Sequence, residues 1–197
     1  MSTKNFVADK DLGEAAERTW LSHLRSKDAS KGLDIEYIHT DGYFPDYDIA
    51  DLSRDFTYEV KYDTISQRTG NFYFEYFNPK RGSASGLMTS KADYLVYIHR
   101  GSKNGQLAIT ADVFSLPILQ AHIEEDAEGL YQKKTPRQDA QRSNPNMKTS
   151  WGAPLESGLK NALGYTANQK YVRKNKKATG WISEVTILNS LLDPLLM

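Results

Sequence analysis

The sequence contains no cysteine, no long apolar run and no excess of either charge. The absence of cysteine excludes disulfide bonds, thiolate metal sites and cysteine nucleophiles. No apolar stretch approaches the roughly 18 residues that a membrane-spanning helix needs. The first residues also lack the apolar segment of a signal peptide. We therefore expect a cytoplasmic protein that has no membrane partner.

The charges balance overall but are unevenly distributed along the chain. Lys and Arg number 25, Asp and Glu also number 25, and the formal net charge is zero. The stretch 131–177 nevertheless holds eleven basic and two acidic residues, a net charge of +9 that the rest of the chain balances with −9. An acidic centre suits metal binding, and a basic flank suits phosphate. A solvated basic loop is the alternative explanation of this stretch.

Two predicted strands carry the acidic and basic residues around which the chain is organised. Apolar and polar residues alternate from Phe56 to Lys61, which is typical of a half-buried strand. The alternation places Glu59 and Lys61 on one face. Asp48 lies between two apolar residues on the preceding strand, and residues 51–55 form the connection of a hairpin. If these strands pair, Asp48 meets Glu59 across the sheet.

Two carboxylates beside an ammonium group suit a hard cation. Mg²⁺ takes oxygen ligands, usually one or two carboxylates completed by water and phosphate. Lys61 would position or deprotonate a water molecule, or offset the charge of a phosphate. Asp46 competes with Asp48 for the first position, since it directly follows Pro45. We favour Asp48, because it lies closer to Glu59 in a hairpin. An exposed strand edge with ordinary charges is the alternative.

This pattern resembles the PD-(D/E)xK nuclease superfamily. The sequence PDYD at 45–48 matches the first part of its motif, and EVK at 59–61 matches the second. The later segments TGN at 69–71 and SGLMTSKAD at 85–93 resemble phage- and plasmid-borne endonuclease-like proteins of the same superfamily. The resemblance covers roughly residues 10–99.

The resemblance implies an α/β fold with a restriction-endonuclease-like αβββαβ core, in which helices flank a mixed central sheet. We expect a single nuclease domain over 1–197, with a core at about 10–125, a basic loop or insertion at about 128–180, and a C-terminal strand and tail at 181–197. The apolar tail either closes the core or forms a homodimer contact. The elements predicted from the sequence pattern are a helix over 10–24 with Asp9 as its N-cap, strands over 33–39, 72–77, 92–99, 106–110 and 181–187, and helices over 116–125 and 156–163.

The implied activity is Mg²⁺-dependent hydrolysis of phosphodiester bonds in DNA, structure-selective in the manner of a resolvase, with Mn²⁺ as a substitute for Mg²⁺. Asp48, Glu59 and the Val60 carbonyl would hold the metal, and Lys61 would activate water. Glu17, on the first predicted helix, would orient Lys61 or bind the metal through water; otherwise it is a carboxylate at the boundary of a helix face. A non-catalytic DNA-binding or assembly protein and a nuclease acting on RNA are the alternatives.

Basic and polar residues beyond the motif are predicted to contact DNA. Residues 131–150 look like a long polar arm that could fold on DNA, and 173–177 looks like a basic turn. Glu75 either joins the site or lies on a solvent-facing strand surface, and His39 is interpreted as structural. The predicted DNA contacts are Arg68, Asn71, Lys91, Lys133, Lys134, Arg137, Arg142, Arg173, Lys174, Lys176 and Lys177.

Overall fold

The computed structural model divides the chain into two compact units. The first consists of Met1–Ile65, Ser90–Val113 and Ser183–Met197, and the second of Ser66–Thr89 and Phe114–Ile182. The predicted organisation as one domain stays a prediction.

Within the described ranges, no helix combines the length and the apolar character that a membrane span requires. The structure describes residues 3–40, 46–64, 66–78, 83–84, 86–103, 106–132, 149–152 and 163–187.

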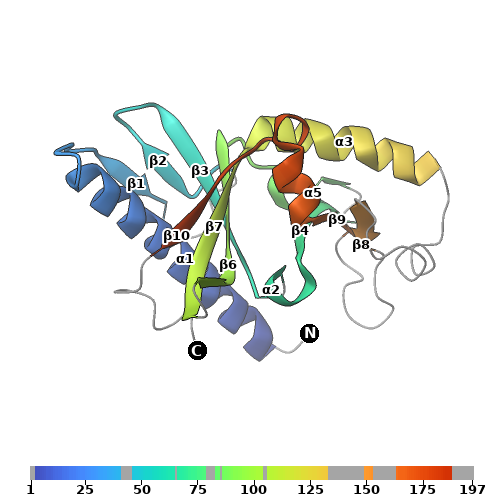
Figure 1. Cartoon of the computed structure of the whole chain (residues 1–197), viewed down its shortest axis with the longest axis horizontal. Coiled ribbons are helices and arrows are strands. Elements are labelled where there is room, and N and C mark those ends of the chain that lie inside the picture. The colour runs from blue at the N-terminus through green and yellow to red at the C-terminus, as the bar shows by residue number, and fades with distance from the viewer. Residues whose placement is uncertain are drawn as a thin grey trace. The chain divides into compact units, whose positions relative to one another are not determined.

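A long helix and a six-stranded sheet are the main elements of the first unit (Figure 1). Neighbouring strands follow the order β1-β2-β3-β6-β7-β10. The pairs β1–β2 and β2–β3 are antiparallel, whereas β3 and β6 are parallel. The expected α/β class with a mixed sheet is therefore confirmed. The elements are α1 (Thr3–Ala29), β1 (Tyr37–His39), β2 (Ile49–Asp51), β3 (Phe56–Asp63), β6 (Tyr94–Lys103), β7 (Gln106–Ser115) and β10 (Trp181–Ile187).

Two predicted boundaries at the start of the chain are wrong. The helix begins at Thr3 rather than after Asp9, because no proline or glycine interrupts the chain before Gly13. It ends at Ala29, shortly before Gly32, which adopts a φ of 69°. The first strand covers only Tyr37–His39 and not 33–39, because its partner β2 is itself only three residues long.

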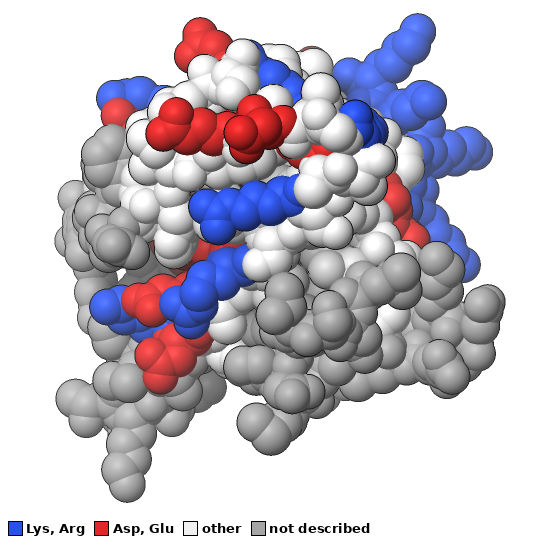
Figure 2. Space-filling view, turned by 90° about the vertical axis from the view of Figure 1, so that its left-hand side faces the viewer, with Lys and Arg blue, Asp and Glu red and all other residues white. Residues whose placement is uncertain are grey.

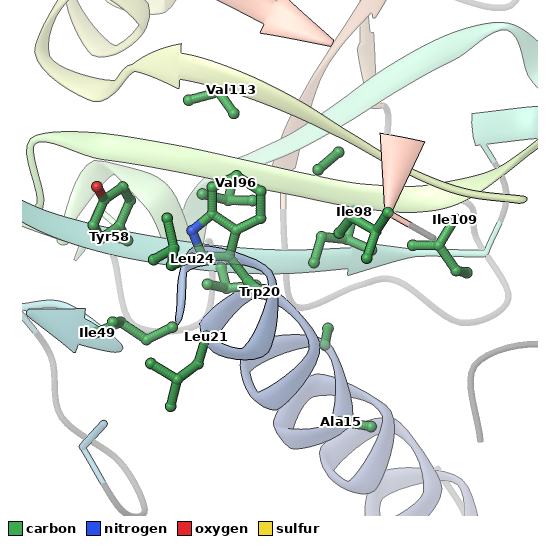
Figure 3. Packing of buried hydrophobic residues seen from close by; sticks show 14 of the residues in the cluster. Ala15, Trp20, Leu21, Leu24, Ile49, Tyr58, Val96, Ile98, Ile109 and Val113 are labelled. Carbon is green, nitrogen blue, oxygen red and sulfur yellow. The ribbon is translucent and has the colours of Figure 1, made fainter. Parts of the chain in front are cut away.

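The core of the first unit lies between α1 and one face of the sheet. Trp20 and Leu24 point from the helix toward the strands, close to Tyr58 and Val96, and Leu21 belongs to the same buried cluster (Figure 3). Trp20 is 4% exposed, and its ring packs edge-on against Tyr58 with centroids 6.3 Å apart. Burial of side chains of this size stabilises the fold by about 1.5–3 kcal/mol each. The helical spacing of these residues therefore explains why α1 is fixed on this face.

The chain between the parallel strands β3 and β6 passes through the second unit. Parallel neighbours need a long crossover, and the resemblance implied one built on a helix. The described part of the crossover instead contains a four-residue helix, a second set of strands and a 3₁₀ turn. These elements are α2 (Ser66–Thr69), β4 (Asn71–Asn78), β5 (Ser83–Ala84) and η1 (Gly86–Met88).

The second unit is built on an antiparallel sheet in the order β5-β4-β9-β8. The predicted aromatic strand is confirmed as β4, whose Phe72 and Phe74 pack against Phe114. The strands β8 and β9 were not predicted, because glycines interrupt their short sequences. The remaining elements are α3 (Leu116–Gln132), β8 (Thr149–Gly152), β9 (Leu163–Asn168), α5 (Gln169–Lys174) and α6 (Lys176–Thr179).

The basic turn predicted at 173–177 is confirmed at Asn175, which joins α5 to α6, whereas the residues on either side of it are helical. The Asn168 side chain accepts hydrogen bonds from the backbone N–H groups of Lys170 and Tyr171 at 3.0 and 3.3 Å. This N-cap satisfies donors that the first turn of α5 leaves unpaired. The helix predicted over 156–163 lies outside the described residues, except that Leu163 begins β9.

A buried ionic cluster connects the end of α1 with the hairpin between β2 and β3. Arg54 donates to Asp28 at 2.7 Å and to Asp51 at 2.9 Å, and the Tyr37 hydroxyl also donates to Asp28. Asp28 and Asp51 are 4% and 1% exposed. The hydrogen bonds from Arg54 and Tyr37 hold the pKa of Asp28 below its usual value. Both carboxylates therefore depend on one guanidinium.

Replacing Arg54 with methionine is expected to destabilise the protein by about 3–5 kcal/mol at pH 7, because it leaves buried carboxylates without their cation. The loss should shrink as the pH falls below about 4. The stability that ionised Asp28 contributes to the wild type disappears as that group becomes protonated. Urea denaturation measures both effects. Arg18→Met is the control, since the Arg18 side chain is 60% exposed and should contribute less than about 1 kcal/mol. An Arg54 variant as stable as this control would contradict the prediction.

Candidate active site

The acidic and basic residues predicted on β2 and β3 lie together in the first unit. Strand pairing joins Ile49 to Tyr58, and one further step in that register places Asp48 opposite Glu59. The backbone N–H of Asp48 donates to the carbonyl of Tyr58 at 2.9 Å, so the pairing extends past the regular strand. Hairpin geometry thus brings together two carboxylates that are separated by ten residues in the sequence.

The contacts of these side chains are local and polar. A carboxylate oxygen of Asp48 accepts a hydrogen bond from the backbone N–H of Val60 at 2.6 Å. Lys61 forms an ion pair with Glu59. The Glu59 side chain is 8% exposed and that of Lys61 is 45% exposed, so the carboxylate is buried and part of the lysine side chain reaches solvent.

Burial and mutual repulsion raise the pKa of Asp48. Desolvation is the larger cause and the charge of Glu59 the second, and together they bring the pKa to about 7. Lys61 and the Val60 N–H act in the opposite direction. Partial burial lowers the pKa of Lys61, but attraction to Glu59 and Asp48 outweighs it, and the net pKa lies above the usual value. Lys61 is therefore an ammonium group at neutral pH, while Asp48 is close to half-protonated.

Glu17 of α1 lies within electrostatic reach of this group. Its charge acts on both Asp48 and Lys61. Its carboxylate lies 2.7 Å from the Nε2 atom of His39. The two side chains are 17% and 19% exposed. His39, which the sequence pattern assigned to a structural role, is therefore a neighbour of the candidate site.

Asp46 and Asp48, the two candidates for the first acidic residue of the site, have different partners. Asp46 forms an ion pair with Lys91 at 3.1 Å, and the Lys91 side chain is 75% exposed. The backbone N–H of Lys91 and the hydroxyl of Ser90 also donate to the Asp46 carbonyl, at 2.9 and 3.0 Å. Asp48, in contrast, lies opposite Glu59. Contact of Lys91 with DNA stays a prediction.

Several other predicted residues belong to the second unit or lie outside the described residues. Asn71 begins β4, where its backbone N–H donates to the Thr69 hydroxyl at 3.3 Å, and Glu75 lies half-buried further along that strand. Arg68 lies in α2. On α5 and α6, Lys174, Lys176 and Lys177 are exposed and Arg173 is half-buried. Lys133, Lys134, Arg137 and Arg142 fall in the undescribed stretch 133–148.

Charges of both signs are mixed on the molecular surface. On the face drawn in Figure 2, acidic and basic side chains lie next to one another, and one group of basic side chains projects at the edge of the view. On the coloured part of this face, the basic side chains that gather together lie at that edge. A polyanion such as DNA needs a cluster of positive charge to offset the repulsion of carboxylates.

The donor set around Asp48 and Glu59 fits a hard cation. Within the described residues, no three His, Asp or Glu side chains come close enough together to enclose a metal ion by themselves. Two carboxylates and nearby backbone oxygens are nevertheless the usual protein contribution to a Mg²⁺ site, in which water supplies the remaining ligands. The donor atoms of Asp48, Glu59 and the backbone are oxygens, which suit Mg²⁺ better than the sulfur and nitrogen ligands of a structural zinc site do.

Asp48→Asn is expected to be more stable than the wild type at pH 8 by up to about 4 kcal/mol, because burial and Glu59 raise the pKa of Asp48 to about 7, and the difference should vanish near pH 4. The raised pKa means that the folded protein binds a proton more tightly than the unfolded chain. Wild-type stability therefore falls as the pH rises from about 4 to 7, and asparagine removes that dependence. Urea denaturation in EDTA at several pH values measures the difference. Exposed Asp34→Asn is the control, and equal pH profiles for all three proteins would refute the expectation.

Comparison of the chain with models of known protein families, with curated proteins and with solved structures finds no match. The candidate site is therefore interpreted from its own geometry.

Proposed function

We propose that the protein is a Mg²⁺-dependent DNA endonuclease with a restriction-endonuclease-like core. The observation that carries the proposal is the convergence of Asp48, just before β2, with Glu59 and Lys61 of the adjacent β3, where Glu59 is buried and Asp48 has a raised pKa. Two carboxylates held this close repel each other unless a cation shares their charge. A divalent cation and a phosphate ester are the partners that such a site favours.

Asp48 and Glu59, with the Val60 carbonyl, would hold Mg²⁺ or Mn²⁺. When bound, the metal would lower the pKa of a water molecule and stabilise the negative charge that develops on the phosphate. The hydrogen bond from the Val60 N–H keeps the Asp48 carboxylate beside β3, so the ligands are oriented before any cation arrives. Oriented ligands need little rearrangement on binding.

Lys61 is placed to neutralise charge and to position water. Its ion pair with Glu59 and its raised pKa keep the ammonium group protonated. To act as a base, Lys61 would first have to lose this proton. That would become easier once a cation shares the charge of Glu59 and Asp48, because these carboxylates are what raise the pKa of Lys61. The side chain is 45% exposed, so a phosphate that approaches from solvent would meet part of it.

Incubation of the protein with supercoiled plasmid and with branched DNA tests the proposal. We expect nicked or linear products with Mg²⁺ or Mn²⁺ and none with EDTA, and preferential cleavage of branched DNA would favour a resolvase. A parallel reaction on RNA distinguishes the other nuclease class. DNA binding without cleavage under every condition would favour a non-catalytic DNA-binding protein and would reject the endonuclease.

A further inference from the structure

The last residue of β1 and the residue that follows it contact both α1 and the segment that carries Asp48. His39 pairs with Ile49 in the β1–β2 ladder, so the next residue, Thr40, lies beside Asp48. Asp48 itself is in a bend rather than in a regular strand. Its position therefore depends on individual hydrogen bonds rather than on a continuous ladder.

Thr40 makes those hydrogen bonds. Its backbone N–H donates to the carbonyl of Asp48 at 2.9 Å. Its hydroxyl lies 3.0 Å from the same carbonyl oxygen and 3.2 Å from that of Tyr47. On the other side, the N–H of Asp48 donates to Tyr58 of β3. The peptide that carries Asp48 is thus fixed between Thr40, which follows β1, and β3. On the Thr40 side, the Asp48 carbonyl is contacted by two groups, the backbone N–H and the hydroxyl of Thr40.

His39 fixes the second acidic group. Its Nε2 atom lies 2.7 Å from Glu17 in a pocket where both side chains are largely buried. An ionised carboxylate only accepts hydrogen bonds, so Nε2 carries the proton and donates it. Pairing of the His39 backbone with β2 restricts where the ring can lie. The Glu17 carboxylate is therefore held at a set position near Asp48 and Lys61, on which its charge acts.

We propose that His39 and Thr40 are positioning residues of the catalytic centre, with Thr40 setting the place of Asp48 and His39 that of Glu17. This inference rests on the proposed function. Groups that orient metal ligands typically contribute 10- to 100-fold to metal affinity or activity. Neither residue needs to touch the substrate for this effect.

Thr40→Val removes the hydroxyl and keeps the shape of the side chain and its backbone N–H. We expect kcat at 1 mM Mg²⁺ to fall about 10- to 100-fold, with an unchanged KM for DNA. The Kd for Mn²⁺ alone, measured by calorimetry, should rise about 10-fold, and higher Mg²⁺ should restore part of the rate. Thr40→Ser should recover most of the loss. Thr57→Val is the control, since its hydroxyl on β3 bonds Asp93 instead.

His39→Leu should lower kcat by about 10-fold or more, and His39→Gln should restore most of it, because its amide N–H can replace the donor at Nε2. If these residues only stabilised the fold, their variants would have a lower melting temperature. The conservative variants would then not restore kcat, and higher Mg²⁺ would not raise the rate.

If wild type cleaves DNA and Thr40→Val has the kcat and Mn²⁺ Kd of Thr57→Val, the role of Thr40 is refuted while the nuclease stands. Equal rates for His39→Leu and wild type would refute the role of His39. A wild type that neither binds Mn²⁺ nor cleaves DNA would overturn both this inference and the proposed function.

Discussion

Lys61→Met is expected to reduce the rate of DNA cleavage at saturating Mg²⁺ by about 10³-fold or more while leaving DNA affinity nearly unchanged. The ammonium group is the only charge in the trio with Asp48 and Glu59 that favours a phosphate, and its side chain is 45% exposed. Loss of a group that stabilises or activates the reacting atoms typically costs 10²- to 10⁴-fold. Methionine keeps the length and packing of the side chain, but the buried Glu59 loses its cation, so urea denaturation must show that the variant is folded under the assay conditions.

Glu59→Gln should remove turnover to a similar extent for a different reason. The amide cannot supply the charge that a divalent cation needs, and it also releases Lys61 from its ion pair. DNA affinity should stay equal or increase, because one negative charge is lost. Single-turnover cleavage and fluorescence anisotropy in EDTA separate the two effects.

Lys10→Met is the control for both variants, since its side chain is 61% exposed on α1. It should cleave at the wild-type rate. If Lys61→Met and Glu59→Gln also cleave within about 10-fold of wild type, the trio is not a catalytic centre. The nuclease activity would then belong to other residues.

The second large effect concerns the basic side chains on α5 and α6. Replacing Arg173, Lys174, Lys176 and Lys177 by alanine should weaken DNA binding strongly and flatten its dependence on salt. Each phosphate contact contributes about 0.9 to the slope of log affinity against log salt concentration. Loss of all four should therefore reduce the slope by up to about 3 to 4 units. Cleavage at saturating DNA should change little, because these residues lie outside the proposed catalytic trio.

A matched variant with four basic residues of α1 replaced by alanine controls for net charge. Lys10, Arg18, Arg25 and Lys27 are exposed and lie outside the predicted DNA contacts. Binding titrations between 50 and 300 mM salt, a range of about six-fold, resolve slopes of this size. If the α5–α6 variant keeps the wild-type slope, or loses no more than the α1 variant, the basic stretch is a solvated surface. The path of DNA would then lie elsewhere.

The sequence by itself determined the hairpin and the sheet face on which the candidate site lies. Ile49, Tyr58 and Val60 must face α1 to be buried, and strand alternation then places Glu59 and Lys61 on the other face. The short connection, residues 52–55 in the structure, favours the antiparallel pairing of these strands, and their register sets Asp48 against Glu59. Local patterns suffice here because the partners are close in the chain.

Only the tertiary structure decided which partners the remaining polar groups have. Nothing in the pattern around His39 points to Glu17, which is 22 residues earlier on another element. Arg54 and Asp28 are 26 residues apart, and Asp46 and Lys91 are 45 apart. The pairing of β4 with β9 joins segments separated by about ninety residues. Hydrophobic periodicity fixes which face of an element is buried, but a hydrogen bond between elements depends on how those elements pack, and that packing is a property of the whole fold.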